Sequence, residues 1–503
     1  MFARASSVAV VGIDGYPIDV EVQVGSGLPS FIVVGLPDTA IQESRERVRA
    51  AVLASGEQWP NQRLTVNLSP AHLPKAGSGF DLAIALALLA AVGRVPSERL
   101  DEVCAVGELS LDGAVRKIRG VLAVVGAAAT KGIRRMLVPR PNAAEAALID
   151  GVEVIPLVTL RQAISFLRGE FAIAPATPAE HPDALAEDVD IAEVRGQMTP
   201  KWALEIAAAG GHNLLMTGPP GGGKTMLARR MPSILPPLAR DDAMVVTRLY
   251  SVAGMLPDES GLILCRPFRA PHHSISTAGL VGGGSGIPMP GEVSLAHRGV
   301  LFLDEAGEFR RDALEALRQP IEDGTVTISR ARVTVTYPSR CQLILATNPC
   351  PCGHYGDQVR SCECAPGRIT VYRQRLSGPL IDRMDLRIKV DRIGKAEIFA
   401  SPTAEPSATI RARIVQAQQR QRAALAPFGV SVNADIPPRA LLRACRITRG
   451  AKAALEAAQG HFGMTMRATH RAIRVARTIA DLTGSGDLTA GHVNEALSFR
   501  QEQ

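Results

Sequence analysis

The chain has 503 residues, of which 46% are hydrophobic and 21% charged, with a formal net charge of +7. Two or three domains are expected at this length, and the composition is that of a globular protein, which excludes fibrous and disordered classes. No apolar run reaches the ~18 residues that span a bilayer, and the first residues lack the apolar segment of a secretory signal. We therefore expect a cytoplasmic location and no membrane partner.

The positive charge is concentrated toward the C-terminal end. From Ser401 onward there are 14 Lys and Arg against 7 Asp and Glu, and the difference of 7 equals the net charge of the whole chain. Such an asymmetry is expected if the C-terminal region binds a polyanion, or if it is simply a solvated basic helical surface. Charge alone does not distinguish these two interpretations. Aromatic residues make up only 4%, which argues against base-stacking platforms for single strands.

Three regions follow one another along the chain. Residues 1–170 alternate strand-like runs such as FIVVGL with alanine-rich helical runs, and the apolar run from Ala83 is expected to be a buried helix. Residues 171–195, rich in Pro, Ala and acidic residues, are predicted to be a linker. Residues 196–392 form a second α/β region, and residues 393–503 are predicted to be largely helical.

A phosphate-binding loop is predicted in the second region. GPPGGGKT, residues 218–225, matches the pattern G-x-x-x-x-G-K-[ST] between an apolar strand and an amphipathic helix. Glycines let backbone N–H groups close around phosphate oxygens, and the helix N-terminus adds partial positive charge. We predict ATP binding, with Lys224 neutralising the β and γ phosphates and Thr225 holding Mg²⁺. The predicted nucleotide-binding residues are Gly218, Pro219, Pro220, Gly221, Gly222, Gly223, Lys224, Thr225 and Asp304.

Two later strands end in polar residues suited to ATP hydrolysis. In VLFLDE the run Val300–Leu303 ends in Asp304, predicted to bind Mg²⁺, and Glu305, predicted to orient and deprotonate the attacking water. In LILATN the apolar run ends in Asn348, whose amide is predicted to hold that water. A simple strand-end turn is the alternative for Asn348.

Arginines near the C-terminal end are the next candidates. Arg383 follows a short predicted helix, where it could reach the ATP of a neighbouring subunit. Arg467, Arg471 and Arg474 are spaced i, i+4, i+7, on one face of a predicted helix, and Arg467 is predicted to touch the nucleotide. For each single arginine, surface solvation is the default alternative.

Four of the eight cysteines are clustered directly after LILATN. Cys350 and Cys352, then Cys362 and Cys364, form two C-x-C pairs that could present four thiolates to a tetrahedral Zn²⁺. His354 could replace one of them, and free thiols or a redox pair are the alternatives. The adjacent His272 and His273 are interpreted as structural, because neighbouring side chains on a regular element diverge.

These motifs, in this order, resemble the AAA+ ATPases of the helix-2-insert group, which includes magnesium chelatase I subunits and MCM helicases. The stretches CRPFRAPHHSISTAGLVGGGSGIPMPGEVSLAHRGVLFLDE and QPIEDGTVTISRARVTVTYPSR carry the likeness. With the N-terminal region included, the resemblance tightens to the YifB/ComM family of magnesium chelatase-like proteins and covers essentially the whole chain.

The resemblance implies a multidomain α/β fold: an N-terminal Lon-protease/ribosomal S5-like α+β domain, an AAA+ core with a helix-2 insert and a pre-sensor hairpin, and a C-terminal helical lid. Lys224 and Thr225 fall on Walker A and Asp304 and Glu305 on Walker B. The remaining family positions are sensor 1 at Asn348, the arginine finger at Arg383 and sensor 2 at Arg467.

Alternation in TVTISRARVTVTY independently predicts a hairpin with Arg330 and Arg332 at its tip, able to grip DNA phosphates without reading sequence. In related helicases such a hairpin enters a central pore, and residues 279–291 would be the second pore element, with a plain flexible loop as the alternative.

The function implied by the family is that of a homo-hexameric, ATP-driven DNA motor that promotes branch migration of recombination intermediates, as in natural transformation, with recombination proteins as further partners. The alternative is a protein-remodelling ATPase of chelatase or chaperone type that does not act on DNA. Peptidase activity is not expected, because Gly79 and Leu122 occupy the positions of the Lon-type nucleophile and lysine.

Overall fold

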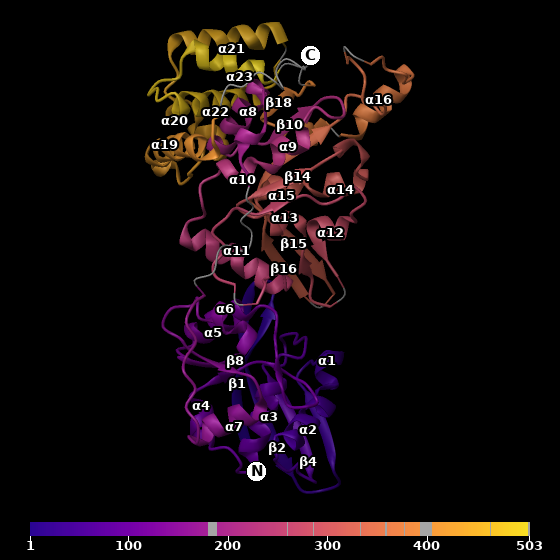
Figure 1. Cartoon of the computed structure of the whole chain (residues 1–503), viewed down its shortest axis with the longest axis vertical. Helices are drawn as coiled ribbons and strands as arrows, with labels where there is room; N and C mark the ends of the chain where they lie inside the picture. The colour runs from indigo at the N-terminus through magenta and orange to yellow at the C-terminus, as the bar shows by residue number, and fades with distance from the viewer. Residues whose placement is uncertain are drawn as a thin grey trace.

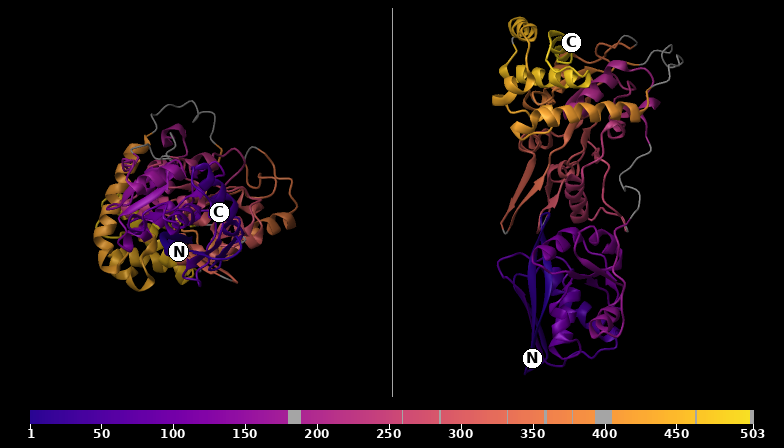
Figure 2. Two further views of the ribbon diagram at one scale, coloured as in Figure 1. Left: turned by 90° about the horizontal axis from the view of Figure 1, so that it is seen from below. Right: turned by 90° about the vertical axis from the view of Figure 1, so that its left-hand side faces the viewer.

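The computed structural model describes residues 1–179, 189–258, 260–284, 286–331, 333–357, 360–376, 378–392, 405–462 and 464–500. The molecule is elongated, with the N-terminal domain at one end, a parallel-sheet domain in the middle and a helical region at the other end (Figures 1 and 2). Arg332 and residues 180–188, which are part of the predicted linker, lie outside the described residues, as do residues 393–404.

The N-terminal domain is built on a seven-stranded mixed sheet in the order β3-β4-β2-β1-β5-β8-β9. Its strands are β1 (Phe2–Val11), β2 (Asp14–Gly25), β3 (Ser30–Val34), β4 (Arg63–Ser69), β5 (Cys104–Ala105), β8 (Arg135–Pro139) and β9 (Glu153–Leu157), with a small hairpin of β6 (Glu108–Leu109) and β7 (Val115–Arg116). Its helices are α1 (Thr39–Gln42), α2 (Ser44–Ala54), α3 (Asp81–Ala91), α4 (Ser97–Asp101), α5 (Val121–Thr130), α6 (Ala143–Ala146) and α7 (Leu160–Arg168).

Helix α3 forms the centre of this domain. Every one of its residues is buried, and it packs against β1 and β2. A helix that is apolar on all sides must be covered on all sides, so the buried helix predicted from Ala83 is confirmed. Asp81 at its first position is paired with Arg47 Nε at 2.6 Å, which neutralises the one carboxylate that the helix buries.

The middle domain contains a five-stranded, entirely parallel sheet in the order β11-β14-β17-β10-β18. The strands are β11 (Phe268–Arg269), β14 (Val300–Leu303), β17 (Gln342–Thr347), β10 (Leu214–Thr217) and β18 (Leu386–Lys389). The central strands β14 and β17 are buried at every position, which explains their unbroken apolar runs. The accompanying helices are α8 (Met198–Gly210), α9 (Lys224–Arg229), α10 (Met231–Ile234), α11 (Arg240–Ala253), α12 (Thr277–Val281), α13 (Glu292–Leu295), α14 (Arg311–Ala316), α15 (Arg318–Asp323), α16 (Pro366–Arg375) and α17 (Gly378–Ile381).

Two hairpins extend from this domain toward the N-terminal domain. The predicted hairpin is present as β15 (Thr325–Arg330) and β16 (Val333–Pro338), paired from Thr325 opposite Pro338 to Arg330 opposite Val333. A shorter hairpin, β12 (Gly282–Gly283) and β13 (Met289–Pro290), lies beside it, and the Tyr337 hydroxyl donates to the Pro288 carbonyl at 2.6 Å. The two elements predicted for a pore are therefore neighbours in space.

The N-terminal domain contacts the longer hairpin. Val11 and Ile13, in the β1–β2 turn, pack against the buried cluster of Leu249, Val335 and Tyr337. Across the same boundary the Lys117 ammonium donates to Asp258 at 2.6 Å. The two domains thus meet through an apolar contact and an ion pair.

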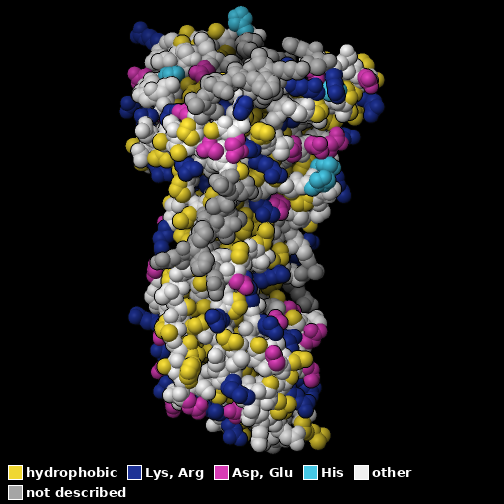
Figure 3. Space-filling model, viewed as in Figure 1, with side chains coloured by type: hydrophobic (Ala, Val, Ile, Leu, Met, Phe, Trp, Pro, Cys, Tyr) yellow, Lys and Arg dark blue, Asp and Glu magenta, His cyan; other side chains and the backbone are white. Residues whose placement is uncertain are grey.

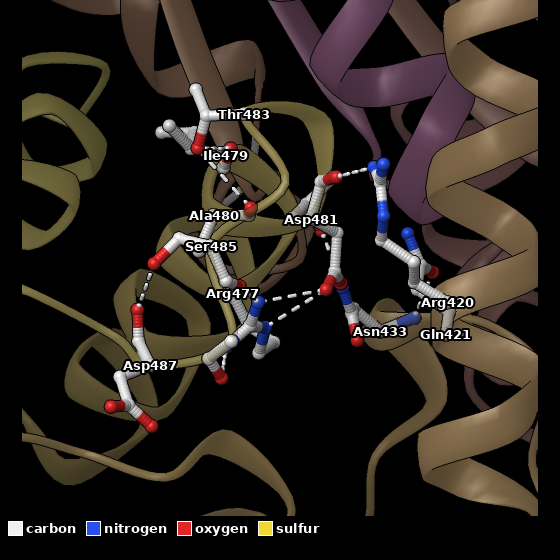
Figure 4. Close-up of polar contacts among 12 residues, drawn as sticks. Arg420, Gln421, Asn433, Arg477, Ile479, Ala480, Asp481, Thr483, Ser485 and Asp487 are labelled. Atoms are coloured by element: carbon white, nitrogen blue, oxygen red, sulfur yellow. Dashed lines mark hydrogen bonds and ion pairs between the residues drawn. The ribbon is translucent and has the colours of Figure 1, made fainter.

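The C-terminal helical region consists of α19 (Ser407–Leu425), α20 (Leu441–Cys445), α21 (Arg449–Phe462), α22 (Met466–Leu482) and α23 (Ala490–Ser498). Asp481 of α22 connects several segments of this region. The Asp481 carboxylate accepts hydrogen bonds from Arg477 at 2.8 Å and from Asn433 at 2.7 Å, and the Asp481 carbonyl accepts one from Arg420 of α19 at 2.6 Å (Figure 4). Because the two side-chain partners are themselves buried, this network holds the helices in one arrangement.

The surface seen in Figure 3 carries Lys and Arg side chains interspersed with Asp and Glu along its length. On this face, the basic excess of the last hundred residues is therefore not gathered into a separate patch. Within the described parts of the chain, no helix combines the length and the apolarity needed to cross a membrane.

Candidate active site

Three predicted motifs meet at one edge of the parallel sheet. Strands β14, β17 and β10 are neighbours, with Leu303 opposite Leu345 and Thr217 opposite Thr347. Because the strands are parallel, the residues that follow them come together at their carboxyl ends, where open α/β sheets bind ligands. The phosphate loop, the Asp304-Glu305 pair and Asn348 are those residues.

The phosphate loop begins in a tight space between two strands. The Gly218 N–H donates to the Thr347 carbonyl at 3.2 Å, and a Cβ placed on Gly218 would lie 2.0 Å from the Val390 carbonyl oxygen. Only glycine fits this close approach. Gly221 and Gly222 continue the turn, and Gly223 is the N-cap of α9, so the loop leads directly into a helix N-terminus.

Gln197 stabilises the phosphate loop, although no sequence motif predicted a role for this residue. Its side-chain amide donates to the Gly222 carbonyl at 3.1 Å and to the Asp391 carbonyl at 2.7 Å. It therefore joins the loop to the segment that follows β18. No motif or spacing marks this residue, because its partners are backbone atoms brought close only by folding.

Lys224 lies at the centre of the site. Its side chain is 8% exposed, and the ammonium donates to the carbonyls of Gly218 at 2.6 Å and Pro219 at 3.0 Å, and to Asn348 Oδ1 at 3.1 Å. Burial lowers the pKa of Lys224, which Asp304 and Glu305 partly offset. A buried cation held only by neutral oxygens is suited to accept an anionic phosphate.

Thr225 and Asp304 are hydrogen bonded, with the hydroxyl oxygen 2.5 Å from Asp304 Oδ2. A hydroxyl and a carboxylate at the mouth of a phosphate loop are the hard oxygen ligands that Mg²⁺ prefers, so the donor set fits that ion. The next residue, Glu305, has φ +50° and an exposed side chain. A glutamate in the left-handed region directly after a buried strand is strained, as residues at functional sites often are.

His273 contacts the predicted catalytic base, which the sequence did not reveal. Its Nδ1 lies 3.4 Å from Glu305 Oε2, and its ring packs on His272 with centroids 4.0 Å apart. The two histidines follow β11, the strand adjacent to β14 in the sheet. Since the sequence does not give strand order, it could not place His273 beside Glu305, and the purely structural interpretation missed this contact.

Arg383 is engaged within its own chain. It follows α17 as predicted, and its guanidinium forms an ion pair with Glu322 of α15 and donates to the Pro379 carbonyl at 2.8 Å. The side chain is 16% exposed, whereas that of Glu322 is 59% exposed. The pair is thus open to solvent on the glutamate side.

The three arginines of α22 have different surroundings. Arg467 is exposed near the helix N-terminus, whereas Arg471 donates to Asp385 at 2.7 Å and to the Arg383 carbonyl at 2.9 Å. Arg474 donates to the Ile436 carbonyl. Arg471 therefore connects α22 to the segment that carries Arg383, the predicted arginine finger. Contact between Arg467 and nucleotide stays a prediction.

The four clustered cysteines converge in space. Their sulfur atoms all lie within 4.8 Å of one another, with Cys350–Cys352 at 3.3 Å and Cys362 at 3.6 Å from each of those two. These separations are too long for disulfide bonds, whose S–S distance is about 2.0 Å, and close to the ~3.8 Å edge of a tetrahedral Zn–S₄ site.

Hydrogen bonds from the His354 and Glu363 N–H groups lower the pKa of Cys352 to about 6. His354 itself pairs with Asp357 at 3.1 Å, so the donor set is four sulfurs.

At the hairpins, Arg330 is exposed at the end of β15, and its guanidinium approaches Gly283 of the neighbouring hairpin. Arg332 lies outside the described residues, so the predicted pair of tip arginines is represented by Arg330. A serine and a lysine lie near the Lon-type positions Gly79 and Leu122 in the sequence, and both have other partners: Ser78 bonds to Glu108, and Lys117 bonds to Asp258 in the middle domain.

The whole chain matches known proteins in sequence. Three models match in succession: subunit ChlI of Mg-chelatase over residues 20–142, magnesium chelatase subunit ChlI over 190–398, and its C-terminal part over 404–500. YifB of Escherichia coli is 41% identical over 496 residues, covering 98% of this chain and 96% of YifB. The competence protein ComM of Haemophilus influenzae is 39% identical over 510 residues, covering 99% and 97%. The chain belongs to the YifB/ComM family of magnesium chelatase-like proteins.

Two further matches agree with this assignment. The uncharacterized protein Rv2897c of Mycobacterium tuberculosis is 46% identical over 500 residues, 99% of this chain and 98% of that protein. A shorter stretch, 136 residues or 27% of this chain, is 28% identical to Lon protease 2 of Bacillus subtilis, covering 23% of that protein. Membership of the YifB/ComM family makes the chain a magnesium chelatase-like AAA+ protein, a class of ATPases that use ATP and Mg²⁺, with a mixed α/β, multidomain fold.

Proposed function

We propose that this YifB/ComM family protein is an ATP-driven motor that acts on DNA as a hexameric ring and promotes branch migration of recombination intermediates. The observation that carries the ATPase part is the convergence of Lys224, Thr225, Asp304, Glu305 and Asn348 at one sheet edge. The relative ComM of Haemophilus influenzae is a competence protein, which supports a role in DNA acquisition.

The proposal gives each residue of this site one role in ATP hydrolysis. Lys224 and the loop N–H groups would bind the β and γ phosphates, and Thr225 and Asp304 would hold a Mg²⁺, which would supply positive charge beside the phosphate oxygens. Glu305 accepts the proton of the attacking water, with His273 on its far side to orient the carboxylate. Asn348 accepts a hydrogen bond from Lys224, and we expect its amide to hold that water once phosphate takes its place at the ammonium.

The ring is proposed because hydrolysis in this class of ATPase uses an arginine, in addition to the lysine of the phosphate loop, to stabilise the transition state. Arg383 is the candidate, and it is bonded to Glu322 within its own chain. If a neighbouring subunit supplies Arg383, the contact is head-to-tail, and such contacts close into a ring under cyclic symmetry. The hexamer is the ring size that the family resemblance implies.

Action on DNA is supported by the adjacent hairpins. The β15–β16 hairpin places the exposed Arg330 at its far end, next to the glycine-rich β12–β13 hairpin. A ribbon with a basic tip can bind phosphates of any sequence, and its grip should weaken as salt rises. Neither β12 nor β13 contains an aromatic residue, in contrast to what we expect of a protein-remodelling motor.

The test is ATP hydrolysis measured without DNA, with single strands, with duplex and with a four-way junction, using Glu305→Gln as the blank. Several-fold stimulation that is strongest with the junction and absent in the blank supports the motor. A rate that DNA does not change, but that the blank abolishes, would leave an ATPase acting on something else, and the protein-remodelling alternative would replace this proposal.

We also propose that Cys350, Cys352, Cys362 and Cys364 bind a structural Zn²⁺. Four sulfurs at tetrahedral spacing, with no fifth donor from His354, match a closed site of the structural kind. Metal analysis of the purified full-length protein should find one zinc per chain. Sub-stoichiometric zinc in a preparation that hydrolyses ATP would overturn the zinc site and leave the ATPase standing.

A further inference from the structure

The cysteine-bearing loop contacts the phosphate loop directly. We call residues 350–357 and 360–364 the cysteine knuckle. A Cβ on Gly353 would lie 2.5 Å from Pro220 Cδ and 3.8 Å from Asn348 Cγ. The Gly353 backbone therefore lies against the Pro220 ring of the phosphate loop, with no room for a side chain between them.

The position of Gly353 is constrained by the two cysteines that precede it. Its N–H donates to the Cys350 carbonyl at 2.9 Å, and the next sulfur ligand is Cys352, one residue before it. Cys350 is fully buried and follows Asn348 by only two residues. The first C-x-C pair thus lies between the residue that contacts Lys224 and the residue that contacts Pro220.

The far side of the knuckle is anchored to the same sheet edge. Asp357 is 3.5 Å from Arg392, which follows β18, and the Tyr355 ring lies 4.8 Å from the guanidinium of Arg373 on α16. Arg373 also donates to the Pro349 carbonyl at 3.3 Å. These contacts hold the knuckle beside the phosphate loop, and the four sulfurs bring its two ends together.

From this arrangement we propose that the metal-bound knuckle is a clamp on the phosphate loop, so that nucleotide affinity depends on metal at the four cysteines. The inference rests on the proposed zinc site. With the metal in place, Cys350 and Cys352 are cross-linked to Cys362 and Cys364, and Gly353 is pressed against Pro220. Without it, the knuckle ends separate, the Gly353–Pro220 contact loosens, and the loop loses its outer support.

The first experiment measures zinc content and nucleotide binding on the same full-length samples. Cys362→Ser and Cys364→Ser remove sulfurs from the distal pair, which does not touch the phosphate loop. We expect both variants to lose zinc and to bind a fluorescent ADP analogue about tenfold more weakly, with unchanged circular dichroism. Cys104→Ala, a buried cysteine of the N-terminal domain, is the control and should change neither quantity.

The second experiment tests the contact itself while leaving the metal ligands intact. Gly353→Ala adds a Cβ at 2.5 Å from Pro220 in a residue with φ +81°. Gly356→Ala is a matched control in the same knuckle, because its φ is +75° but a Cβ there meets nothing within 4 Å. We expect both variants to keep zinc, and only Gly353→Ala to weaken binding of the analogue, by about tenfold.

Each outcome has a distinct meaning. Loss of zinc without loss of affinity in the serine variants would overturn the clamp while leaving the zinc site in place. Equal effects of Gly353→Ala and Gly356→Ala would also overturn it, because backbone strain and not the Pro220 contact would then be responsible. Failure of the unmodified, zinc-loaded protein to bind the analogue at all would instead refute the nucleotide site.

Discussion

The Arg383 guanidinium is paired with the Glu322 carboxylate of the same chain, and Glu322 lies in the helix that leads into the β15–β16 hairpin. Arg383, which we propose acts on the ATP of a neighbouring subunit, is therefore linked through Glu322 to the β15–β16 hairpin, which we propose contacts DNA. Because Glu322 is 59% exposed, the ion pair is weak enough for Arg383 to leave it and bind another partner.

Glu322→Gln should raise the rate of ATP hydrolysis, because it frees Arg383 for the neighbouring site. An exposed ion pair contributes roughly 0.2–1 kcal/mol, so the increase should not exceed about fivefold. Steady-state hydrolysis at saturating ATP measures the effect, with Arg383→Ala expected to lower the same rate by about 10³. If Glu322→Gln instead lowers the rate, the pair positions Arg383 and does not restrain it.

Mixing two inactive variants should restore hydrolysis if Arg383 acts on the neighbouring subunit. Arg383→Ala retains an intact Glu305, and Glu305→Gln retains an intact Arg383, so some interfaces of a mixed assembly are complete. The rate should rise above the sum of the separate rates and peak near equal amounts. A strictly additive rate in an assembly shown to exchange subunits would argue that Arg383 acts only within its own chain.

Arg471→Ala should destabilise the docking of the C-terminal region, because it leaves Asp385 buried without its cation. Breaking such a buried pair costs roughly 3 kcal/mol or more, and Arg471 and Asp385 are 19% and 6% exposed. The fluorescence of Trp202, whose indole donates to Glu495 of α23 at 2.5 Å, reports this docking during denaturation. Arg467→Ala, an exposed change in the same helix, should leave the transition in place and lower the ATPase rate if Arg467 serves as sensor 2.

The protein should lose stability as pH falls from about 6.5 toward about 4, through His297. Burial lowers the pKa of His297 to about 4, and its Nδ1 accepts a hydrogen bond from the Arg340 N–H at 3.1 Å, so the folded state holds the neutral ring. The unfolded chain binds a proton near pH 6.5, which favours unfolding throughout that window and has its full effect below pH 4. In His297→Gln, the melting temperature should change less between pH 7 and pH 4 than in the unmodified protein, and an identical pH profile would contradict the assignment.

Arg330→Ala should weaken DNA binding to a similar degree for unrelated sequences. Losing one phosphate contact per subunit reduces the slope of log affinity against log salt by roughly 1 per engaged subunit. Fluorescence anisotropy at several salt concentrations measures it, with Lys131→Ala, an exposed change in the N-terminal domain, as control. An unchanged slope would remove the hairpin from the proposed DNA interface.

The elements of the ATPase site could be predicted from the sequence because each is a local pattern. Apolar runs predicted β14 and β17, and glycine spacing predicted the phosphate loop, whose Gly218 has room for no side chain. Alternation predicted the β15–β16 hairpin, and a continuous apolar run predicted the buried α3. In each case the constraint acts between residues close in the chain, so the order of residue types is sufficient.

The phosphate loop, the strands that end in motif residues, the hairpin and the family are therefore evident from the amino-acid sequence. The contacts between side chains depend on the fold: His273 lies beside Glu305, Arg383 pairs with Glu322, and Gly353 packs against Pro220. These contacts join segments that are distant in the chain, and they follow from the order of parallel strands and from the path of the loops between them. Local residue patterns do not record that order, because side-chain packing across the whole domain selects it.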